Sequence, residues 1–560
     1  MNVGSLSETR GERLTQQAII VIAALLVIYP VGWLLYASAT PGGKPGFDAY
    51  VALFANPELF RVFLNSVLVA ICAALIALGC GVPLAFLAVR SDLRGRSLIS
   101  LCAMVPLITP PFIGGLAWAV LGAPQTGLLN LAGKWLGLTE PWLNIYSLGG
   151  MIFCLGIYMS PYVYVLTAGV LAAIDPALEE AAETSGSRTG DVLRSVVLPL
   201  AIPGIGAAAL VAFLNAIEQF GIPAILGRPA NVFLLPTEIY RLMGRMPPNL
   251  AQAAAAATLL MVLSAIAIAL QQFLVTRRSY VTVSGKGFRH KRLALGAWRA
   301  PAYGLVVAYA LLAVALPVLA LLVNSLLAAG FVSLTGNSLS FRHYVYLWAE
   351  YPAGLRSLWN GALYSAIGAT AALILGAVGA YFIARNRGWF ARVAGMVLVL
   401  PLALPGIVIG TGLMLAYIKP PLVLYGTMWI LVVSYITRFL PFGERATSSA
   451  LLQVDRSLEE ASAVCGASWF ATFRWVLLPL IRPALIGGWL LLFISMVREL
   501  GTSVLLYSYG QEVPAVVLFD LYESGNMGSM SAYATILLVL TLIIVVAFQK
   551  FLSTEFAPSN

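Results

Sequence analysis

Two polar stretches of the chain repeat one pattern: Asp175-Pro176-Ala177-Leu178-Glu179-Glu180-Ala181-Ala182 and Asp455-Arg456-Ser457-Leu458-Glu459-Glu460-Ala461-Ser462. The second follows the first by 280 residues, and the match continues through Gly186 and Gly466 to Leu198-Pro199-Leu200 and Leu478-Pro479-Leu480. Similarity at a fixed spacing indicates an internal repeat. The chain is therefore predicted to contain two copies of one structural unit.

Earlier segments match as well, at a larger spacing of 295 residues. The matched positions are Asn65 with Asn360, Arg90 with Arg385, Pro106 with Pro401, and Pro110 with Pro405. The change of spacing predicts extra residues in the first copy, in the loop 122–146.

The composition indicates a membrane protein. Of the 560 residues 60% are hydrophobic and only 10% are charged, and the mean hydropathy is +0.90. Apolar runs reach about twenty residues, the length of a membrane-spanning helix and about twice that of a barrel strand. The predicted fold class is an all-α polytopic membrane protein with about twelve helices. The expected spans lie near 17–38, 64–89, 98–121, 147–173, 200–222, 252–275, 301–327, 357–384, 391–417, 421–441, 482–503 and 533–552.

The first span could be taken for a signal peptide, because Ala37-Ser38-Ala39 resembles a cleavage site. Its apolar stretch is longer than that of a signal peptide, so we expect a retained anchor.

Lys and Arg set the predicted orientation, because they concentrate in cytoplasmic loops. With both termini in the cytoplasm, the even-numbered loops are inside and contain the basic residues, whereas the outer loop 504–531 contains no Lys or Arg. Six spans per copy make the copies parallel. The predicted division is a first repeat at 1–275, a basic cytoplasmic linker at 276–300 and a second repeat at 301–560. The net charge of +10 then faces anionic lipid headgroups and requires no nucleic acid.

Each repeated stretch predicts a helix–turn–helix on the cytoplasmic face. Asp175 or Asp455 can cap a short helix whose first turn carries the Glu pair. Gly186 or Gly466 then permits a left-handed turn, and Pro199 or Pro479 starts the next span. A single copy could be an interfacial amphipathic connection, but two copies favour a docking element.

These stretches resemble the cytoplasmic loop of permease subunits in binding-protein-dependent ABC importers. That loop reads roughly Glu-Ala-Ala, three residues, Gly, and then about a dozen residues to Leu-Pro, and only Ser462 departs from it. The resemblance implies a type I importer permease fold in which the loops couple to ATPase subunits. The coupling residues it implies are Glu179, Glu180, Ala181, Ala182, Gly186, Glu459, Glu460, Ala461 and Gly466.

The sequence contains no Gly-x-x-x-x-Gly-Lys-Ser/Thr motif, so no ATP site of its own and no enzyme activity are expected. ATP and magnesium would bind to partner subunits, and no cofactor to this chain. The resemblance implies two ATPase copies and an extracytoplasmic solute-binding protein in a bacterial inner membrane.

The fused permeases of ferric iron importers resemble this chain in size and in two further motifs. Gln219-Phe220-Gly221 and Arg498-Glu499-Leu500 occupy the positions of Asp-Phe-Gly and Lys-Glu-Leu. Gln219 replaces an acid that a hard cation would prefer. Ferric iron is the solute we expect, with thiamine, polyamine, phosphonate or another small anion as alternatives.

Two other classes explain the sequence less well. A secondary transporter with parallel repeats would leave the paired loops unexplained and would carry more intramembrane carboxylates. A membrane enzyme would need a convergent acid, base or metal cluster. His290 and His343 are predicted on opposite faces, so no metal site is expected, and the cysteines suggest no disulfide framework.

Polar residues near the ends of otherwise apolar spans, three of them charged, are the candidates for the translocation path: Glu218, Gln219, Arg498 and Glu499. Charges in lipid are costly and usually face a bundle interior. Glu218 and Arg498 occupy equivalent positions, so we expect them to meet across the pathway near its outer side and to help close it. The alternative is that each snorkels to headgroups or pairs within its own half.

Overall fold

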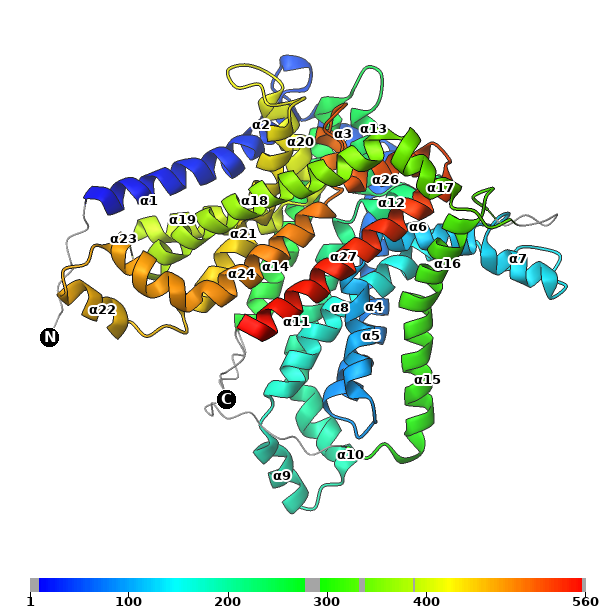
Figure 1. Cartoon of the computed structure of the whole chain (residues 1–560), viewed down its shortest axis with the longest axis horizontal. Helices are drawn as coiled ribbons and strands as arrows, with labels where there is room; N and C mark the ends of the chain where they lie inside the picture. The colour runs from blue at the N-terminus through cyan, green and yellow to red at the C-terminus, as the bar shows by residue number, and fades with distance from the viewer. Residues whose placement is uncertain (1–9, 277–292, 332–337, 386–387, 556–560) are drawn as a thin grey trace.

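The computed structural model describes residues 10–276, 293–331, 338–385 and 388–555, and over these ranges the chain is helical, with two isolated β-bridges and no strands. Most of the basic linker predicted at 276–300 lies outside the described residues. Figure 1 shows long helices from both halves crossing one bundle.

The first half contains five long helices and several short ones. Its elements are α1 (Arg10–Ala23), η1 (Ala24–Ile28), α2 (Tyr29–Ala39), η2 (Pro41–Gly43), α3 (Asp48–Ala55), α4 (Pro57–Val89), α5 (Arg96–Ile108), α6 (Pro111–Gly122), α7 (Leu128–Trp135), α8 (Leu148–Ala173), α9 (Pro176–Thr184), α10 (Thr189–Val192), η3 (Leu193–Val197), α11 (Leu198–Ile217), α12 (Gly221–Leu226), α13 (Leu235–Met243) and α14 (Leu250–Thr276).

The second half repeats the order of the long helices. Its elements are η4 (Gly296–Trp298), α15 (Arg299–Ala310), η5 (Leu311–Ala315), α16 (Leu316–Leu326), α17 (Arg342–Val345), η6 (Tyr346–Glu350), α18 (Pro352–Arg385), α19 (Trp389–Val399), η7 (Leu400–Ala403), α20 (Gly406–Tyr417), α21 (Met428–Leu451), α22 (Ser457–Val464), α23 (Trp469–Thr472), η8 (Phe473–Leu477), α24 (Leu478–Val497), α25 (Ser503–Leu506), α26 (Pro514–Glu523) and α27 (Met527–Glu555).

The number of spans agrees with a polytopic bundle. Within the described ranges nine helices are long and apolar enough to cross a membrane, or eleven if each of two bent pairs is one span. Helix α21 has the length of a span, but it carries Arg438, Glu444 and Arg445 and is not among them. With α21, the bundle reaches the predicted number of about twelve.

Two predicted spans are not straight. The segments predicted at 98–121 and 391–417 bend by 96° between α5 and α6 and by 111° between α19 and α20. Pro110 and Pro111 lack the N–H groups that would bond the carbonyls of Pro106 and Leu107, so the helix breaks there. Pro405 precedes Gly406 at the corresponding break.

The predicted starts of the fifth span in each half are also wrong. Pro199 and Pro479 do not begin a helix, because the helical path starts earlier, at α10 and α23, and runs into α11 and α24. A π-helical turn, η3 or η8, precedes each proline. There the Leu198 N–H bonds Leu193 and the Leu478 N–H bonds Phe473, five residues back. The wide turn accommodates a proline ring that would clash in a regular helix.

The first helix of each half packs against the other half. Helix α2 contacts α20 as well as α14, and α16 contacts α6 as well as α27. In Figure 1, α1 lies beside α19, although the two are far apart in sequence. The two halves are therefore interlocked.

Pro30, together with the π-turn before it, frees backbone carbonyls just before α2 for hydrogen bonds from the second half. Its missing N–H leaves the Leu26 carbonyl unpaired, and the π-turn η1 frees that of Leu25 because Tyr29 bonds Ala24 instead. The Thr437 and Tyr417 hydroxyls of the second half donate to these two carbonyls, each at 3.2 Å.

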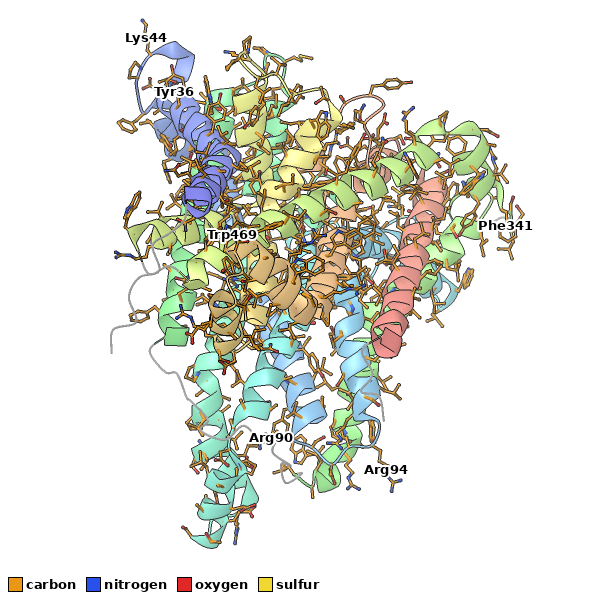
Figure 2. The ribbon with its side chains drawn as sticks, turned by 60° about the vertical axis from the view of Figure 1, so that its left-hand side comes forward. Tyr36, Lys44, Arg90, Arg94, Phe341 and Trp469 are labelled. Carbon is orange, nitrogen blue, oxygen red and sulfur yellow. The ribbon has the colours of Figure 1, made fainter. Side chains whose placement is uncertain are left out.

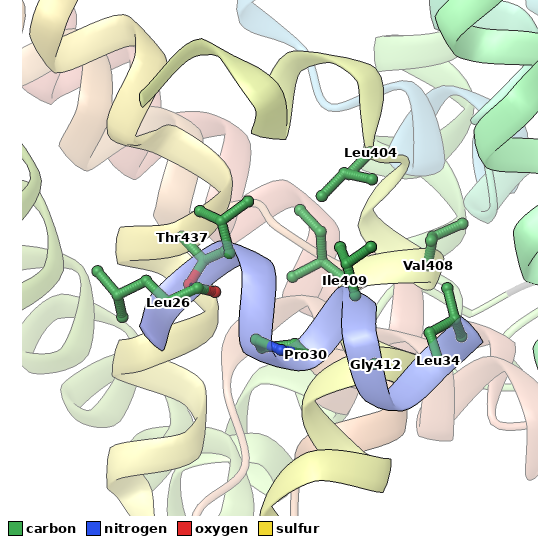
Figure 3. Close-up of a pocket in the computed structure, with 10 residues that line it drawn as sticks. Leu26, Pro30, Leu34, Leu404, Val408, Ile409, Gly412 and Thr437 are labelled. Carbon is green, nitrogen blue, oxygen red and sulfur yellow. The ribbon is translucent and has the colours of Figure 1, made fainter. Parts of the chain in front are cut away.

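An apolar groove lines the contact between α2 and α20 (Figure 3). Leu26, Pro30 and Leu34 face Val408, Ile409 and Gly412 across it. A Cβ on Gly412 would lie 2.9 Å from the Pro30 carbonyl oxygen, so glycine allows the two backbones to approach closely.

Equivalent glycines form close contacts between paired helices in each half. A Cβ on Gly81 of α4 would lie 2.7 Å from the Val163 Cβ and 2.9 Å from the Tyr164 nitrogen of α8. A Cβ on Gly376 of α18 would lie 2.4 Å from the Glu444 nitrogen of α21. Small residues let membrane helices pack backbone to backbone. The repeat seen in the sequence is thus a repeat of helix contacts.

Candidate coupling loops and interface charges

The first repeated stretch folds as the predicted helix–turn–helix. The Asp175 side chain caps α9 by accepting a hydrogen bond from the Ala177 N–H at 2.9 Å. Gly186 follows the helix with φ +91°, and the Ser187 N–H bonds the Ala182 carbonyl at 3.1 Å. These are the features of a helix ended by a left-handed glycine.

The second stretch has the same backbone. Asp455 accepts from the Ser457 N–H at 2.8 Å, and this bond lowers the pKa of Asp455. Gly466 has φ +80°, and the Ala467 N–H bonds the Ser462 carbonyl at 3.1 Å. Ser462, the one departure from the motif, hydrogen-bonds the Thr472 hydroxyl at 2.9 Å and so ties α22 to α23.

The predicted coupling residues differ in exposure. Exposed residues in each loop include the second glutamate, the alanine after it and the glycine: Glu180, Ala181, Gly186, Glu460, Ala461 and Gly466. The remaining ones, Glu179, Ala182 and Glu459, are half-buried. Figure 1 shows α9 at the bottom of the molecule and α22 at its left edge, both away from α13 and α26 near the top.

Glu179 is held by a buried arginine. Arg90, at the end of α4 and 3% exposed, forms an ion pair with Glu179 and donates from Nη2 and Nε to the Leu171 carbonyl at 2.7 and 3.1 Å. Arg90 thus fastens the first loop to the ends of α4 and α8. Figure 2 shows Arg90 and Arg94 at the lower end of the molecule and Tyr36 and Lys44 at the upper end. The side chain of the equivalent Arg385 lies outside the described residues.

The linker adds a strand-like contact at the same end. The Leu293 N–H bonds the Arg90 carbonyl at 2.8 Å, and the Asp92 N–H bonds the Leu293 carbonyl at 3.1 Å. Asp92 also pairs with Arg299, which lowers the pKa of Asp92. The start of the second half is therefore fixed to the first.

Glu218 and Arg498 do not pair with each other as expected, and each contacts the other half. Glu218, at the end of α11, lies 3.5 Å from Nη2 of Arg438 on α21. Arg498, at the end of α24, donates from Nη1 to the Leu107 and Ile108 carbonyls of α5, both at 2.9 Å. The Leu107 carbonyl is one that the prolines at the helix break leave unpaired, so Arg498 caps α5.

Arg438 is the functional candidate that the sequence reasoning missed. Its Nε lies 3.2 Å from Glu499 Oε2, so one guanidinium serves carboxylates of both halves. Glu499 also accepts from the Thr502 N–H at 3.0 Å. The sequence did contain a signal for it. Arg438 is a charged residue inside the predicted span 421–441, and the same feature singled out Arg498.

Aromatic rings adjoin these charges. Phe220, two residues after Glu218, lies 5.9 Å from Phe519 of the second half, measured between ring centroids. Phe112 and Tyr240 lie 6.1 and 6.0 Å from the same Phe519 ring. A ring of the second half is thus packed among three rings of the first. Gln219, between Glu218 and Phe220, is half-buried.

No group of three or more His, Cys, Asp and Glu side chains within the described ranges could hold a metal ion. His343 contacts the Ser529 hydroxyl and the Leu327 carbonyl, which gives it a structural role.

Comparison with protein families defines the class. A family of binding-protein-dependent transport system inner membrane components matches residues 52–280 and 372–555, one segment in each half. The match covers more than half of the chain, so the chain belongs to this family and is a multi-pass permease subunit of an ABC importer.

Among similar proteins is the ferric transport system permease protein FbpB of Actinobacillus pleuropneumoniae, 25% identical over 97% of this chain and 78% of that protein. The Fe(3+)-transport system permease protein FbpB 2 of Haemophilus influenzae is 22% identical over 90% of this chain and 93% of its own length. A putative 2-aminoethylphosphonate transport system permease protein PhnV of Salmonella paratyphi A is 28% identical over 28% of this chain and 58% of its own. A solved bacterial ABC transporter involved in alginate import aligns with 44% of this chain and 87% of its own, at 21% identity and a TM-score of 0.36.

Proposed function

We propose that this chain forms the membrane pathway of a ferric iron importer. The supporting observation is the extent of the similarity: permeases named for ferric iron match 97% and 90% of the chain, whereas the permease named for 2-aminoethylphosphonate matches 28%. Phosphonate or another small anion is the second candidate. Gln219 favours that alternative, because it stands where the resembling motif has an acid, and a hard cation prefers carboxylate oxygens.

We also propose that ATP is hydrolysed by two partner subunits, which dock on α9 and α22 through Glu180, Ala181 and Gly186 and through Glu460, Ala461 and Gly466. The exposed positions of these residues and the two left-handed glycines support this role. Magnesium and ATP would bind to those subunits, since the sequence has no P-loop. An extracytoplasmic binding protein would deliver the solute.

The orientation follows from this proposal. Both loops must face the cytoplasm, and the chain termini then lie there too. Arg90 and Arg94 fall at the loop end of the molecule, as the positive-inside rule requires. Single cysteines at Ser187 and Ser468 in a cysteine-free background should be labelled only from the cytoplasmic side.

The identity of the solute can be tested with the complex of this chain and its ATPase subunits in lipid vesicles. We expect the native binding protein loaded with Fe³⁺ to stimulate ATP hydrolysis well above the unloaded binding protein. Stimulation by 2-aminoethylphosphonate and not by Fe³⁺ would replace ferric iron with the anion.

A further inference from the structure

Charged side chains at the ends of α11 and α24 each contact the opposite half of the molecule. Glu218 of the first half reaches Arg438 of the second, and Arg498 of the second half reaches two carbonyls of the first. Glu499 completes the set through Arg438. The four side chains carry two positive and two negative charges, so the set as a whole is neutral.

These contacts depend on the relative position of the halves. The side chains of Glu218, Arg438 and Glu499 are 26%, 20% and 9% exposed, so water does little to replace a lost partner. Moving α11 away from α21 would separate Glu218 from its cation. An ionised group left alone in such a place is strongly unfavourable. The ion pairs therefore favour the arrangement seen here over one with the halves parted.

Gly406, the first residue of α20, leaves the space that the Arg438 guanidinium occupies. A Cβ at this position would lie 1.6 Å from Arg438 Nη1 and 3.0 Å from Glu499 Oε1. The guanidinium crosses directly over the glycine. An alanine there would require the guanidinium to shift and would disturb its contacts with the two carboxylates, without altering any charge.

We propose that Glu218, Arg438, Glu499 and Arg498 form a latch between the halves that holds the transporter in its resting state. Arg438 is its central positioning residue. The latch adjoins the aromatic cluster of Phe112, Phe220, Tyr240 and Phe519, since Phe112 and Arg498 line one cavity and Phe220 follows Glu218 by two residues. Each transport cycle then requires the Glu218–Arg438 contact to break, and the contact prevents ATP hydrolysis in the absence of loaded binding protein. This inference rests on the proposed coupling to ATPase subunits.

The experiment measures ATP hydrolysis by the reconstituted complex without binding protein. Arg438→Gln and Gly406→Ala should raise this basal rate roughly fivefold to tenfold, a typical size for conformational coupling. Glu218→Gln should raise it less, because Glu499 remains paired. Adding Glu218→Gln to Arg438→Gln should have little further effect, since Glu218 acts through Arg438. Arg438→Lys should restore part of the wild-type behaviour.

A matched control is the pair Glu238 and Arg241, which lies within one helix at 2.7 Å. Glu238→Gln with Arg241→Gln removes an ion pair of the first half alone and should leave the basal rate unchanged. If Arg438→Gln does not fold, the variant with Glu218, Arg438 and Glu499 all changed to Gln leaves none of the three charges unpaired.

A wild-type basal rate in both Gly406→Ala and the triple variant would overturn the latch, as would an equal rise in the control. The measurement needs no solute, so it is independent of the ferric assignment. Failure of the wild-type chain to bind any ATPase would instead refute the proposed coupling.

Discussion

The two halves have the same backbone at their repeated loops but opposite charges at the ends of α11 and α24. Asp175 and Asp455 each accept a backbone N–H, and Gly186 and Gly466 share left-handed φ values. Yet the position of Glu218 in one half is that of Arg498 in the other. The residues that determine the chain path have been retained in both copies, whereas those that contact the other half have diverged. Divergence at the interface allows one chain to pair its halves through complementary charges.

The largest loss of stability is expected at the equivalent glycines that lie between paired helices in both halves. Gly376→Ala places a methyl group against the Glu444 backbone, and Gly81→Ala places one against Val163. Overpacking of this kind should lower the free energy of unfolding by about 3 kcal/mol in each case. Gly79→Ala is the matched control, since no atom lies within 4 Å of the added Cβ. Thermal unfolding of the purified variants measures the difference, and tolerance at only one site would show that the halves pack differently.

Arg90→Ala tests a contact described only in the first half. It removes the ion pair with Glu179 and leaves the Leu171 carbonyl without its donor. We expect a loss of about 2 kcal/mol from the unsatisfied groups, together with weaker ATPase binding at the first loop. Arg94→Ala is the control, because the Arg94 side chain is exposed and only its backbone contacts Tyr303. Equal stability of the two variants in thermal unfolding would contradict this role.

The turn glycines should behave alike. Gly186→Val and Gly466→Val each force a β-branched residue into a left-handed conformation, which costs about 1–2 kcal/mol and distorts the docking surface. Neither added Cβ would meet an atom within 4 Å, so the cost comes from the backbone alone. Asn tolerates this conformation, so Gly466→Asn should retain most transport. Transport and ATPase association at wild-type level in Gly466→Val would refute the coupling role of the loop.

The smallest expected effect is on the pH dependence of stability. It compares carboxylates on two short helices at the end of the molecule opposite the loops, α13 and α26. Glu238 of α13 is paired with Arg241, whereas Asp520 of α26 lies near Glu523 and accepts a 3.5 Å hydrogen bond from the Tyr507 hydroxyl. Burial and the neighbouring carboxylates raise the pKa of Asp520 to about 6. The folded state therefore binds the proton of the Asp520 carboxyl more tightly than the unfolded state does. The resulting stabilisation is lost as the pH rises from about 4 to above 6.

Asp520→Asn should accordingly be more stable than the wild type at pH 7.5 and should lose that advantage near pH 4. Unfolding temperatures at the two pH values provide the measurement. Glu238→Gln should show the opposite sign at pH 7.5, because it removes one partner of an ion pair.

The sequence by itself determined the class, the duplication and the loops. Membrane helices satisfy their own backbone, so apolar length alone predicts them. A cap depends on residues two or three positions apart, which is why Asp175, Asp455 and both left-handed glycines could be predicted. The prolines also carry a local signal, since within the described ranges each of the five π-turns is followed by a proline two residues later, at Pro30, Pro199, Pro317, Pro352 and Pro479.

Only the tertiary structure decided which charges meet. Equivalent positions suggested that Glu218 and Arg498 would face each other, but the pseudo-symmetry places each against a different element of the opposite half. Arg438 comes from a helix more than 200 residues from Glu218 in sequence, and its position depends on Gly406, which is distant in sequence from both. Such contacts depend on how whole helices pack, and no local pattern of residues encodes them. The Leu107 carbonyl that the prolines leave unpaired at the end of α5 likewise has its donor, Arg498, in the other half.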